Sequence, residues 1–344
     1  MRLLFIKLKH IGDALIMTPM LTAVRARHPE AEIHVVVRRG TEGILAGCPA
    51  IDQLHTSAAP AGERQRGALW HDIQLLRRLR RVGFDSAFEL GDGDRGRMLA
   101  WLCGAQQRFA NDTQPPMSRW WRSRFTKVST ENRKRRHQVE KDFVTVQSTL
   151  NLDEPIPPMC FDVSASESWP NPEPFILFHP ATRWKQKRWP RERWVELGRS
   201  LSNSHSIVVS CGPDAEEVAE AQVIVDSIGA RATSTEGKLS WAQLAGALRA
   251  AKMFVGVDTA AMHLAAACQC PTVALFGSSR NWAWRPWAVR HQILGPSKAD
   301  WQAVHESAQA QQEIRKLIFK VSVEETLAAC RAMLENQPGL QPST

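Results

Sequence analysis

The chain has 344 residues, enough for two typical domains of ~150 residues each. Hydrophobic residues make up 43% of it and charged residues 23%, which excludes an intrinsically disordered or low-complexity protein. The net charge is +9, and it is unevenly distributed along the chain. Seven scattered cysteines argue against a disulfide framework, and no apolar run reaches the ~18 residues of a membrane span. We therefore expect a cytoplasmic protein without a signal peptide.

Short apolar strands alternate with helical patterns in the first half of the chain. Strands are predicted over residues 2–8, 32–37, 51–55 and 86–90. A turn at Gly12-Asp13 follows the first strand, and Thr18-Pro19 suits a helix start. Further helices are predicted near 98–102 and along an apolar stripe at helical spacing, namely Trp70, Ile73, Leu76 and Leu79. Such alternation predicts a parallel sheet covered on both faces.

The composition then changes. Six prolines lie between residues 155 and 174, and no regular element tolerates that density, so this segment is predicted to be a linker. Strands are predicted again over 175–179, 207–211, 253–257 and 272–276, with helices over 190–201, 214–228, 240–251 and 260–268. Two α/β halves suggest two Rossmann-like domains facing each other across a cleft, with ligands at the carboxyl ends of the strands.

Much of the positive charge lies in one block. Residues 119–141 contain nine Lys and Arg against Glu131 and Glu140, together with Trp120, Trp121 and Phe125. Such a block suits nucleic acid, an anionic membrane face or a phosphorylated substrate, and a solvated surface loop is the plain alternative. No recognisable nucleic-acid module accompanies it, so we expect no nucleic-acid partner.

Asp13 is the first candidate for chemistry. It follows the first predicted strand and would lie at the carboxyl edge of the sheet, where a general base is useful. Gly12 beside it would let a substrate approach the backbone. A side chain that only caps a helix explains the same position equally well.

Two segments of the second half also follow strands and lead into helices. In 255–265, Asp258 can cap the helix, Thr259 adds a hydroxyl and His263 follows on the same face, so the helix start suits a phosphate or is simply a capped helix. In 179–190, two lysines and two arginines could neutralise a diphosphate leaving group, or belong to a surface loop pinned by tryptophans. Asp92-Gly93-Asp94 resembles a metal motif, but turn chemistry explains it better.

Three motifs in this order resemble the ADP-heptose:lipopolysaccharide heptosyltransferases, glycosyltransferase family 9. They are Lys9-His10-Ile11-Gly12-Asp13-Ala14-Leu15 with Thr18-Pro19, then Arg183-Trp184-x-x-Lys187-x-Trp189, and then 257–267 followed by 271–277. The similarity extends over roughly residues 1 to 335. The region 121–140, the Arg183-Trp184 variant and the Asp-Thr-Ala-Ala-Met-His variant at 258–263 resemble the branch-adding, heptosyltransferase III-like subgroup.

The resemblance implies a GT-B fold, with an acceptor-binding domain over 1–165, a Pro-rich linker over 155–174 and an ADP-sugar-binding domain over 173–335. It implies inverting transfer of heptose from ADP-L-glycero-D-manno-heptose to the inner core of lipopolysaccharide. Asp13 matches the general base and Lys187 the lysine at the donor phosphates. Matched to the donor site are Thr182, Arg183, Glu216, Leu239, Asp258, Thr259, Ala260 and His263. Alanine stands at 260 where many relatives have glycine.

The acceptor side is implied less directly. A phosphorylated lipid A-core acceptor suits the cations Lys9, Arg133, Lys134, Arg135 and Arg136, in a protein held peripherally at the cytoplasmic face of the inner membrane. We expect no cofactor and no metal. The alternatives are a catalytically silent nucleotide-sugar-binding protein on the same fold, or a glycosyltransferase that uses another acceptor.

Overall fold

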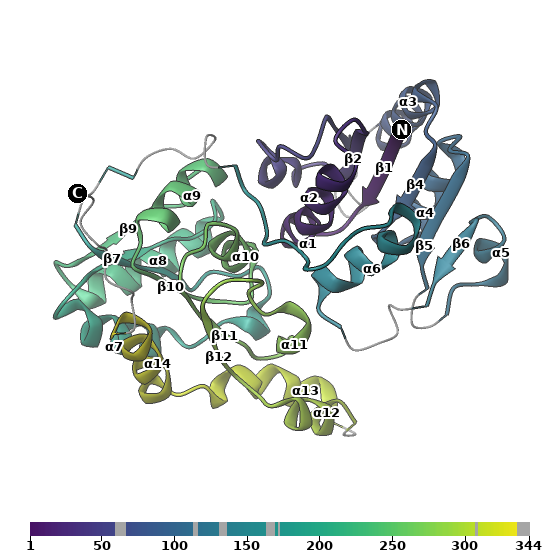
Figure 1. Cartoon of the computed structure of the whole chain (residues 1–344). Helices are drawn as coiled ribbons and strands as arrows, with labels where there is room; N and C mark the ends of the chain where they lie inside the picture. Colours follow the sequence, from purple (N-terminus) through teal and green to yellow (C-terminus); the bar gives the residue numbers. More distant parts are fainter. Residues whose placement is uncertain are drawn as a thin grey trace. The chain divides into compact units, whose positions relative to one another are not determined.

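A computed structural model describes residues 1–58, 67–112, 116–130, 136–162, 169–170, 173–306 and 309–335. The chain forms two compact units, Met1–Val163 and Ser164–Thr344, and the division falls within the proline-rich segment 155–174. Each unit contains one sheet of six parallel strands with helices packed on it (Figure 1). Among the helices in these ranges, none is long and apolar enough to cross a membrane.

In the N-terminal unit the strands lie in the order β3-β2-β1-β4-β5-β6. They are β1 (Arg2–Lys7), β2 (Glu32–Arg38), β3 (Gln53–Ser57), β4 (Ser86–Glu89), β5 (Gln107–Asn111) and β6 (Lys127–Ser129). The helices are α1 (Ile11–Ile16), α2 (Thr18–Arg27), the 3-10 helix η1 (Glu42–Leu45), α3 (Ala68–Val82), α4 (Asp94–Leu102), α5 (Arg119–Arg122) and α6 (Gln138–Leu150).

Two layers of helices bury the two faces of this sheet. Leu4 and Ile6 of β1 pack in one core cluster with residues of α3, α4 and α5. The intervening Phe5 lies on the second, opposite face of the sheet. Its ring stacks on that of Phe88, and the Phe88 ring stacks on that of Phe109, at centroid distances of 5.1 and 4.9 Å. Helices α2 and α6 lie side by side over that second face (Figure 1). The alternation along β1 is the period of two that a strand buried on both faces requires.

Several elements differ from the sequence prediction. Strand β3 lies two residues later than the predicted 51–55, and α1 occupies the segment where a turn was expected. The predicted stripe on α3 is only partly buried: the helix buries Leu75 and Leu79, whereas Trp70 is 55% exposed. The guanidinium of Arg77 lies over the Trp70 ring, 5.4 Å from its centroid, so a neighbouring arginine rather than the sheet covers one face of this indole.

In the C-terminal unit the strands lie in the order β12-β11-β10-β7-β8-β9. They are β7 (Phe175–His179), β8 (Ser206–Val209), β9 (Ala232–Ser234), β10 (Met253–Val257), β11 (Thr272–Leu275) and β12 (His291–Leu294). The helices are the 3-10 helix η3 (Lys185–Lys187), α7 (Arg191–Ser202), α8 (Ala215–Ile228), α9 (Trp241–Ala250), α10 (Ala260–Ala267), α11 (Asn281–Trp284), α12 (Lys298–Glu306), α13 (Ala310–Lys316), the 3-10 helix η4 (Leu317–Lys320) and α14 (Val323–Glu335).

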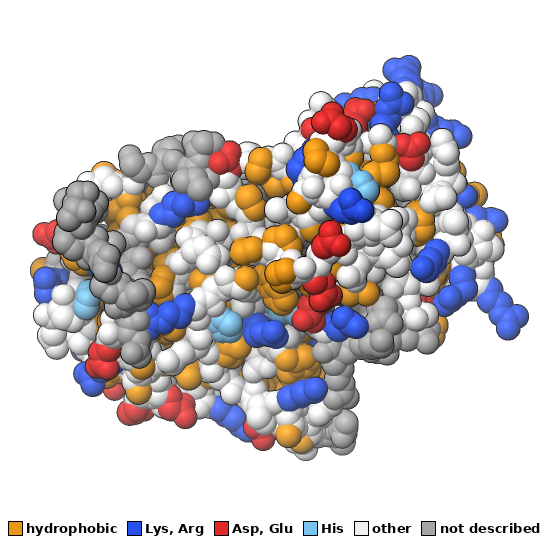
Figure 2. All heavy atoms as spheres, in the orientation of Figure 1, with side chains coloured by type: hydrophobic (Ala, Val, Ile, Leu, Met, Phe, Trp, Pro, Cys, Tyr) orange, Lys and Arg blue, Asp and Glu red, His pale blue; other side chains and the backbone are white. Residues whose placement is uncertain are grey.

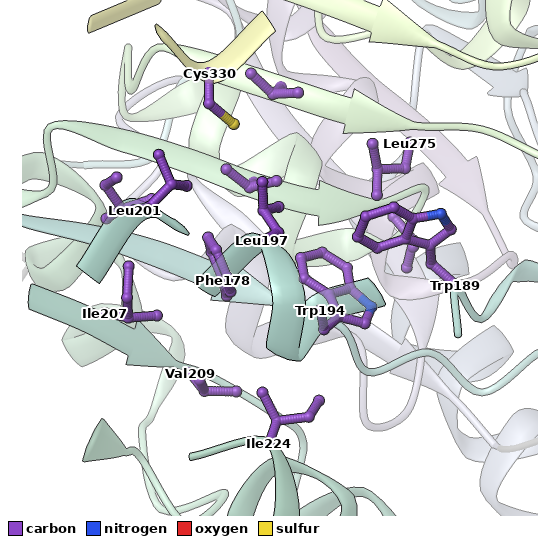
Figure 3. Packing of buried hydrophobic residues seen from close by; sticks show 14 of the residues in the cluster. Phe178, Trp189, Trp194, Leu197, Leu201, Ile207, Val209, Ile224, Leu275 and Cys330 are labelled. Atoms are coloured by element: carbon purple, nitrogen blue, oxygen red, sulfur yellow. The ribbon is translucent and has the colours of Figure 1, made fainter. Parts of the chain in front are cut away.

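The core on one face of this second sheet is shown in Figure 3. Alternate strand residues such as Phe178 and Ile207 meet Trp194 and Leu197 of α7 and Cys330 of α14. The ring of Trp194 packs edge-on against Trp189, at a centroid distance of 5.1 Å. The indole N–H of Trp189 donates to the carbonyl of Val321 at 2.8 Å, so this tryptophan fixes the end of the loop after β7 in the core.

Both sheets have a point where the strand order reverses. It lies between β1 and β4 in the N-terminal unit, and between β7 and β10 in the C-terminal unit. The connections that leave these neighbouring strands diverge to opposite sides, which opens a crevice at their carboxyl ends, where α/β proteins bind ligands. The segments that follow β1, β4, β7 and β10 are therefore where a site is expected.

Candidate functional site

In the C-terminal unit, the segments after β7 and β10 meet at Lys187 and Asp258. The ammonium nitrogen of Lys187 lies 2.7 Å from Oδ2 of Asp258 and 3.4 Å from its backbone carbonyl oxygen. The two side chains are 21% and 8% exposed. Trp189 anchors the loop that carries Lys187, so the lysine is held at the reversal point of the sheet, as its spacing after a strand predicted.

Thr259 is the N-cap residue of α10. Asp258 was expected to cap this helix, but its carboxylate pairs with Lys187 instead, and no side chain accepts a cap hydrogen bond here. The hydroxyl of Thr259 is buried and has no hydrogen-bond partner among the described residues. Ala260 is half-buried in the first turn. The first amides of a helix have no intrahelical acceptor and carry partial positive charge, so this end of α10 suits an anion.

His263, one turn into α10, lies close to Asp258. Its Nε2 is 3.9 Å from Oδ1 of Asp258, and its side chain is 3% exposed. The imidazole also lies 6.3 Å, centroid to centroid, from the ring of Trp284 in α11. The imidazole therefore lies near the carboxylate that pairs with Lys187, at a distance too long for a direct hydrogen bond.

Of the other residues in the loop after β7, Thr182 is buried, whereas Arg183 and Trp184 are exposed. Thr182 is buried, and its hydroxyl accepts from the Trp184 amide at 3.3 Å. Arg183 is exposed, with its guanidinium 5.9 Å from the Trp184 ring centroid. Trp184 is itself 46% exposed. The two neighbouring side chains present a cation and a flat ring to solvent beside the Lys187–Asp258 pair.

Glu216 and Leu239 lie farther along the carboxyl edge of the same sheet. Glu216 is in the first turn of α8, where the Arg188 guanidinium hydrogen-bonds its carboxylate and lowers its pKa. Lys185 lies 3.5 Å from the same carboxylate, so Glu216 joins the site through the loop that carries Lys187. Leu239 is half-buried, immediately before the Ser240 cap of α9.

In the N-terminal unit, Asp13 lies in the first turn of α1, after β1. Its carboxylate accepts from the His10 amide at 3.2 Å and is half-buried. The capping interaction expected as the plain alternative is therefore present, and it leaves lone pairs on the carboxylate for another donor. Lys9, also half-buried, lies between β1 and α1.

Only some of the described charged and aromatic side chains in the basic block 119–141 are exposed. Arg136 is half-buried, while Arg133, Lys134 and Arg135 lie outside the described residues. Lys141 forms an ion pair with Asp92 and is 10% exposed, so it adds no surface charge. Trp121 and Phe125 are buried in the core, because they pack with α3 and α4 under the sheet. Among the aromatic residues of the block, Trp120 is the exposed one, at 50%.

Sequence reasoning missed a group of ionisable side chains at the reversal point of the N-terminal sheet. Lys7 at the end of β1 pairs with Asp142 of α6, and both are buried. Glu89 at the end of β4 is fully buried, and burial raises its pKa to about 7. The only signal available was a charged residue ending each of two apolar strands.

Asp92 and Asp94 pair with Lys141 and Arg97, so turn and helix-start contacts account for both. Within the ranges described, no three His, Cys, Asp or Glu side chains gather as a metal site.

Comparison with known proteins decides the family. The model named Glycosyltransferase family 9 (heptosyltransferase) matches residues 73–314, more than half of the chain. The chain belongs to glycosyltransferase family 9. The matched region includes Lys187, Asp258 and His263, and it begins after Asp13.

Relatives of this family 9 protein cover most of its length. It is 25% identical over 292 residues to lipopolysaccharide heptosyltransferase 3 of Escherichia coli, which covers 80% of this chain and 84% of the relative. It is 27% identical over 293 residues to lipopolysaccharide heptosyltransferase 1 of Pseudomonas aeruginosa, with coverage of 80% and 79%.

Solved structures show the fold. A family 9 glycosyl transferase from Veillonella parvula superposes with a TM-score of 0.81 at 20% identity, covering 98% of both chains. An Escherichia coli heptosyltransferase solved with ADP superposes with a TM-score of 0.75 at 20% identity, covering 91% of this chain and 100% of that one. The family 9 protein therefore has the GT-B fold of two Rossmann-like domains, as the sequence motifs implied.

Proposed function

We propose that this family 9 glycosyltransferase moves heptose from ADP-L-glycero-D-manno-heptose to the inner core of lipopolysaccharide, with inversion at the anomeric carbon. One solved relative, an Escherichia coli heptosyltransferase, has been solved both with ADP and with an ADP-heptose derivative, and curated relatives are lipopolysaccharide heptosyltransferases, which supports this donor and this acceptor class. The observation that carries the proposal is the group formed by Lys187, Asp258 and Thr259 at the start of α10. It combines a cation, an unpartnered hydroxyl and helix amides, the groups that a departing diphosphate requires.

The C-terminal unit is assigned to the donor. Lys187, Thr259 and the amides around Ala260 bind the diphosphate, with Thr182 and Arg183 supporting the same loop. Asp258 keeps Lys187 oriented, and His263 lies near the Asp258 carboxylate. Leu239 packs against the adenine. Glu216 reaches the ribose when Arg188 and Lys185 release it.

The N-terminal unit is assigned to the acceptor, with Asp13 as general base. An acceptor hydroxyl oxygen attacks the anomeric carbon of the heptose as Asp13 takes the hydroxyl proton. The bond from that carbon to the β-phosphate oxygen breaks, and its electron pair leaves with ADP. Lys187 and the α10 amides stabilise the negative charge that develops on the diphosphate. Attack from the side opposite the leaving group inverts the anomeric centre, and holding both substrates supplies much of the acceleration.

The acceptor is a phosphorylated lipid, which calls for cations and a membrane contact. Lys9 and the stretch Arg133, Lys134, Arg135 and Arg136 are assigned to its phosphates. Trp120 is exposed, with the Arg124 guanidinium 4.8 Å from its ring centroid. Figure 2 shows further Lys and Arg side chains gathered over the part of the N-terminal unit where α3 lies. Tryptophan beside arginine suits the headgroup layer of an anionic membrane, so we place the protein peripherally at the cytoplasmic face of the inner membrane.

The acceptor assignment is tested by incubating the protein with ADP-heptose and a panel of core oligosaccharides truncated one sugar at a time. The proposal expects the mass of one heptose to be added to at least one acceptor of the panel, and the shortest acceptor that gains it identifies the core sugar that is required. Mass spectrometry follows the gain of mass, and ADP release is measured in the same samples. Binding of ADP with no transfer to any acceptor would instead identify a silent nucleotide-sugar-binding protein.

A further inference from the structure

Five ionisable side chains gather at the carboxyl ends of β1 and β4 in the N-terminal unit. Lys7 pairs with Asp142, and these side chains are 3% and 0% exposed; Lys141 pairs with Asp92, and these are 10% and 15% exposed. Glu89 is fully buried beside them. Burying ion pairs costs desolvation energy that apolar residues of the same size would not incur. Such a cluster at the reversal point of the sheet therefore indicates a task other than stability.

Glu89 organises the turn that follows β4. Its Oε1 accepts from the Gly91 amide at 2.8 Å, and its Oε2 accepts from the Asp92 amide at 3.2 Å. Asp92 has a φ of 60°, a strained conformation for a residue with a side chain, and both hydrogen bonds help to hold it. A Cβ at Gly96 would lie 2.6 Å from Oε1 of Glu89, so glycine at this position leaves the carboxylate its room.

This turn packs directly on the segment that leads to Asp13. A Cβ at Gly91 would lie 3.1 Å from the Leu8 nitrogen and 3.7 Å from Cα of Lys7. The amide of Leu90 donates to the carbonyl of Ile6 at 2.8 Å. Two residues after Leu8, the His10 amide donates to the Asp13 carboxylate. Glu89 therefore fixes a turn against which the strand-to-helix segment carrying Asp13 is packed.

Helix α6 is fixed to the same edge. Lys141 and Asp142 are consecutive residues of its first turns, and they pair with Asp92 after β4 and Lys7 at the end of β1. The basic block 119–141 leads into this helix. The two ion pairs thus hold the carboxyl ends of β1 and β4 and the end of the basic block together.

We propose that Glu89 is a positioning residue for Asp13, acting through the Gly91–Asp92 turn. This role rests on the proposed function, in which Asp13 takes the acceptor proton. Ionised Glu89 accepts from both amides, whereas a protonated carboxyl group has one oxygen occupied by its own proton. Ionisation therefore tightens the turn and raises turnover.

Burial and the charges around Glu89 set the pH at which its carboxyl group ionises. Burial raises the pKa of Glu89 to about 7, and the Asp92 carboxylate adds to the rise. Arg97, the Gly91 amide and Lys141 act in the opposite direction and keep the value from rising further. Turnover of the parent is accordingly expected to increase with pH through an inflection near 7.

Two variants of this edge test the proposal. Glu89→Gln keeps one acceptor and replaces the other with an amide donor. Gly96→Ala pushes the carboxylate away without changing any charge. Glu32→Gln, at the amino end of the same sheet in an exposed pair with Arg2, is the matched control. Both test variants are expected to show faster hydrogen exchange in the peptide spanning Leu8 to Asp13, and the control to show the parent's rate.

Turnover supplies the second readout. At pH 8, each test variant is expected to lose at least tenfold in kcat, with the acceptor KM and ADP affinity within twofold of the parent. Glu89→Gln should also lose the inflection near pH 7 without a lower melting temperature, a combination that a purely structural role would not give. In an Asp13→Asn background, neither Glu89→Gln nor Gly96→Ala should lower kcat any further.

The outcomes separate the two proposals. Unchanged exchange over Leu8 to Asp13, or an equal further loss of kcat in the Asp13→Asn background, would overturn the positioning role. Faster exchange in a protein that transfers no heptose would overturn the proposed function and leave the structural coupling of Glu89 to the Asp13 segment standing.

Discussion

Replacing Lys187 with alanine removes the cation that the donor site presents to a diphosphate. The substitution also leaves the Asp258 carboxylate, which is 8% exposed, without its partner and next to the bound phosphates. A hydrogen bond to a charged group contributes about 1.5–3 kcal/mol, so ADP affinity should fall about 10- to 100-fold. Turnover should fall further, by about 10²–10³-fold, because the charge on the diphosphate grows in the transition state.

Lys185 offers a control two residues away in the same short helix. Its side chain is 77% exposed and lies 3.5 Å from Glu216, so Lys185→Ala should change ADP affinity and turnover by less than threefold, as for other exposed pairs worth about 0–1 kcal/mol. Adding Asp258→Asn to Lys187→Ala should recover part of the ADP affinity, since it removes the unpaired negative charge. Calorimetry with ADP and steady-state kinetics measure both quantities. A larger effect of Lys185 than of Lys187 would show that the phosphate contact is misassigned.

Three other predictions address the base, the nucleotide and the buried carboxyl group. Asp13→Asn should lower turnover about 10²–10⁴-fold, the range for loss of a general base, with ADP affinity unchanged; near-normal turnover would make Asp13 only a helix cap. Calorimetry should show ADP binding at least tenfold tighter than UDP or GDP, a difference of about 1.4 kcal/mol, because Leu239 is assigned to the adenine; equal affinities would remove that assignment. The pKa of Glu89 is raised from 4.5 to about 7 on folding, so the folded parent binds the extra proton and loses stability as pH rises through this window. The free energy of unfolding of Glu89→Gln minus that of the parent should therefore rise by up to about 3 kcal/mol from pH 4.5 to pH 8. Denaturant titrations in which this difference does not change with pH would refute the pKa shift.

Local sequence patterns predicted the elements that periodicity specifies. The helix start at Ser240 and the strands β7, β10 and β11 lie where the predicted helix start and the short apolar runs place them. Strands β5, β6, β9 and β12 were not predicted, because at least half of the residues in each are polar and none of them forms the apolar run that marks a buried strand. Helix α6 was also missed, because the basic block before it dominates the local composition.

For the candidate site too, the local sequence indicated where some residues lie but not which side chains they contact. The Lys187–Asp258 contact joins residues 71 apart in the chain. The sequence placed each residue after a strand, at one edge of the sheet, but it did not indicate that the two side chains pair. The Lys7–Asp142 pair joins residues 135 apart, and nothing in the local sequence around either residue indicates the other. Trp70 shows the converse: helical spacing predicted a shared stripe, but only tertiary contacts decide whether a sheet or an arginine covers the ring.

The most direct test of the account is a coupled assay of the parent and Asp13→Asn with ADP-heptose and a lipid A-core acceptor. Acceptor mass and released ADP are measured in the same time course. The account predicts that the parent adds one heptose for each ADP released, while Asp13→Asn binds ADP normally and transfers at least 10²-fold more slowly. Parent protein that binds ADP without transferring heptose, or Asp13→Asn protein that transfers at the parent's rate, would contradict it.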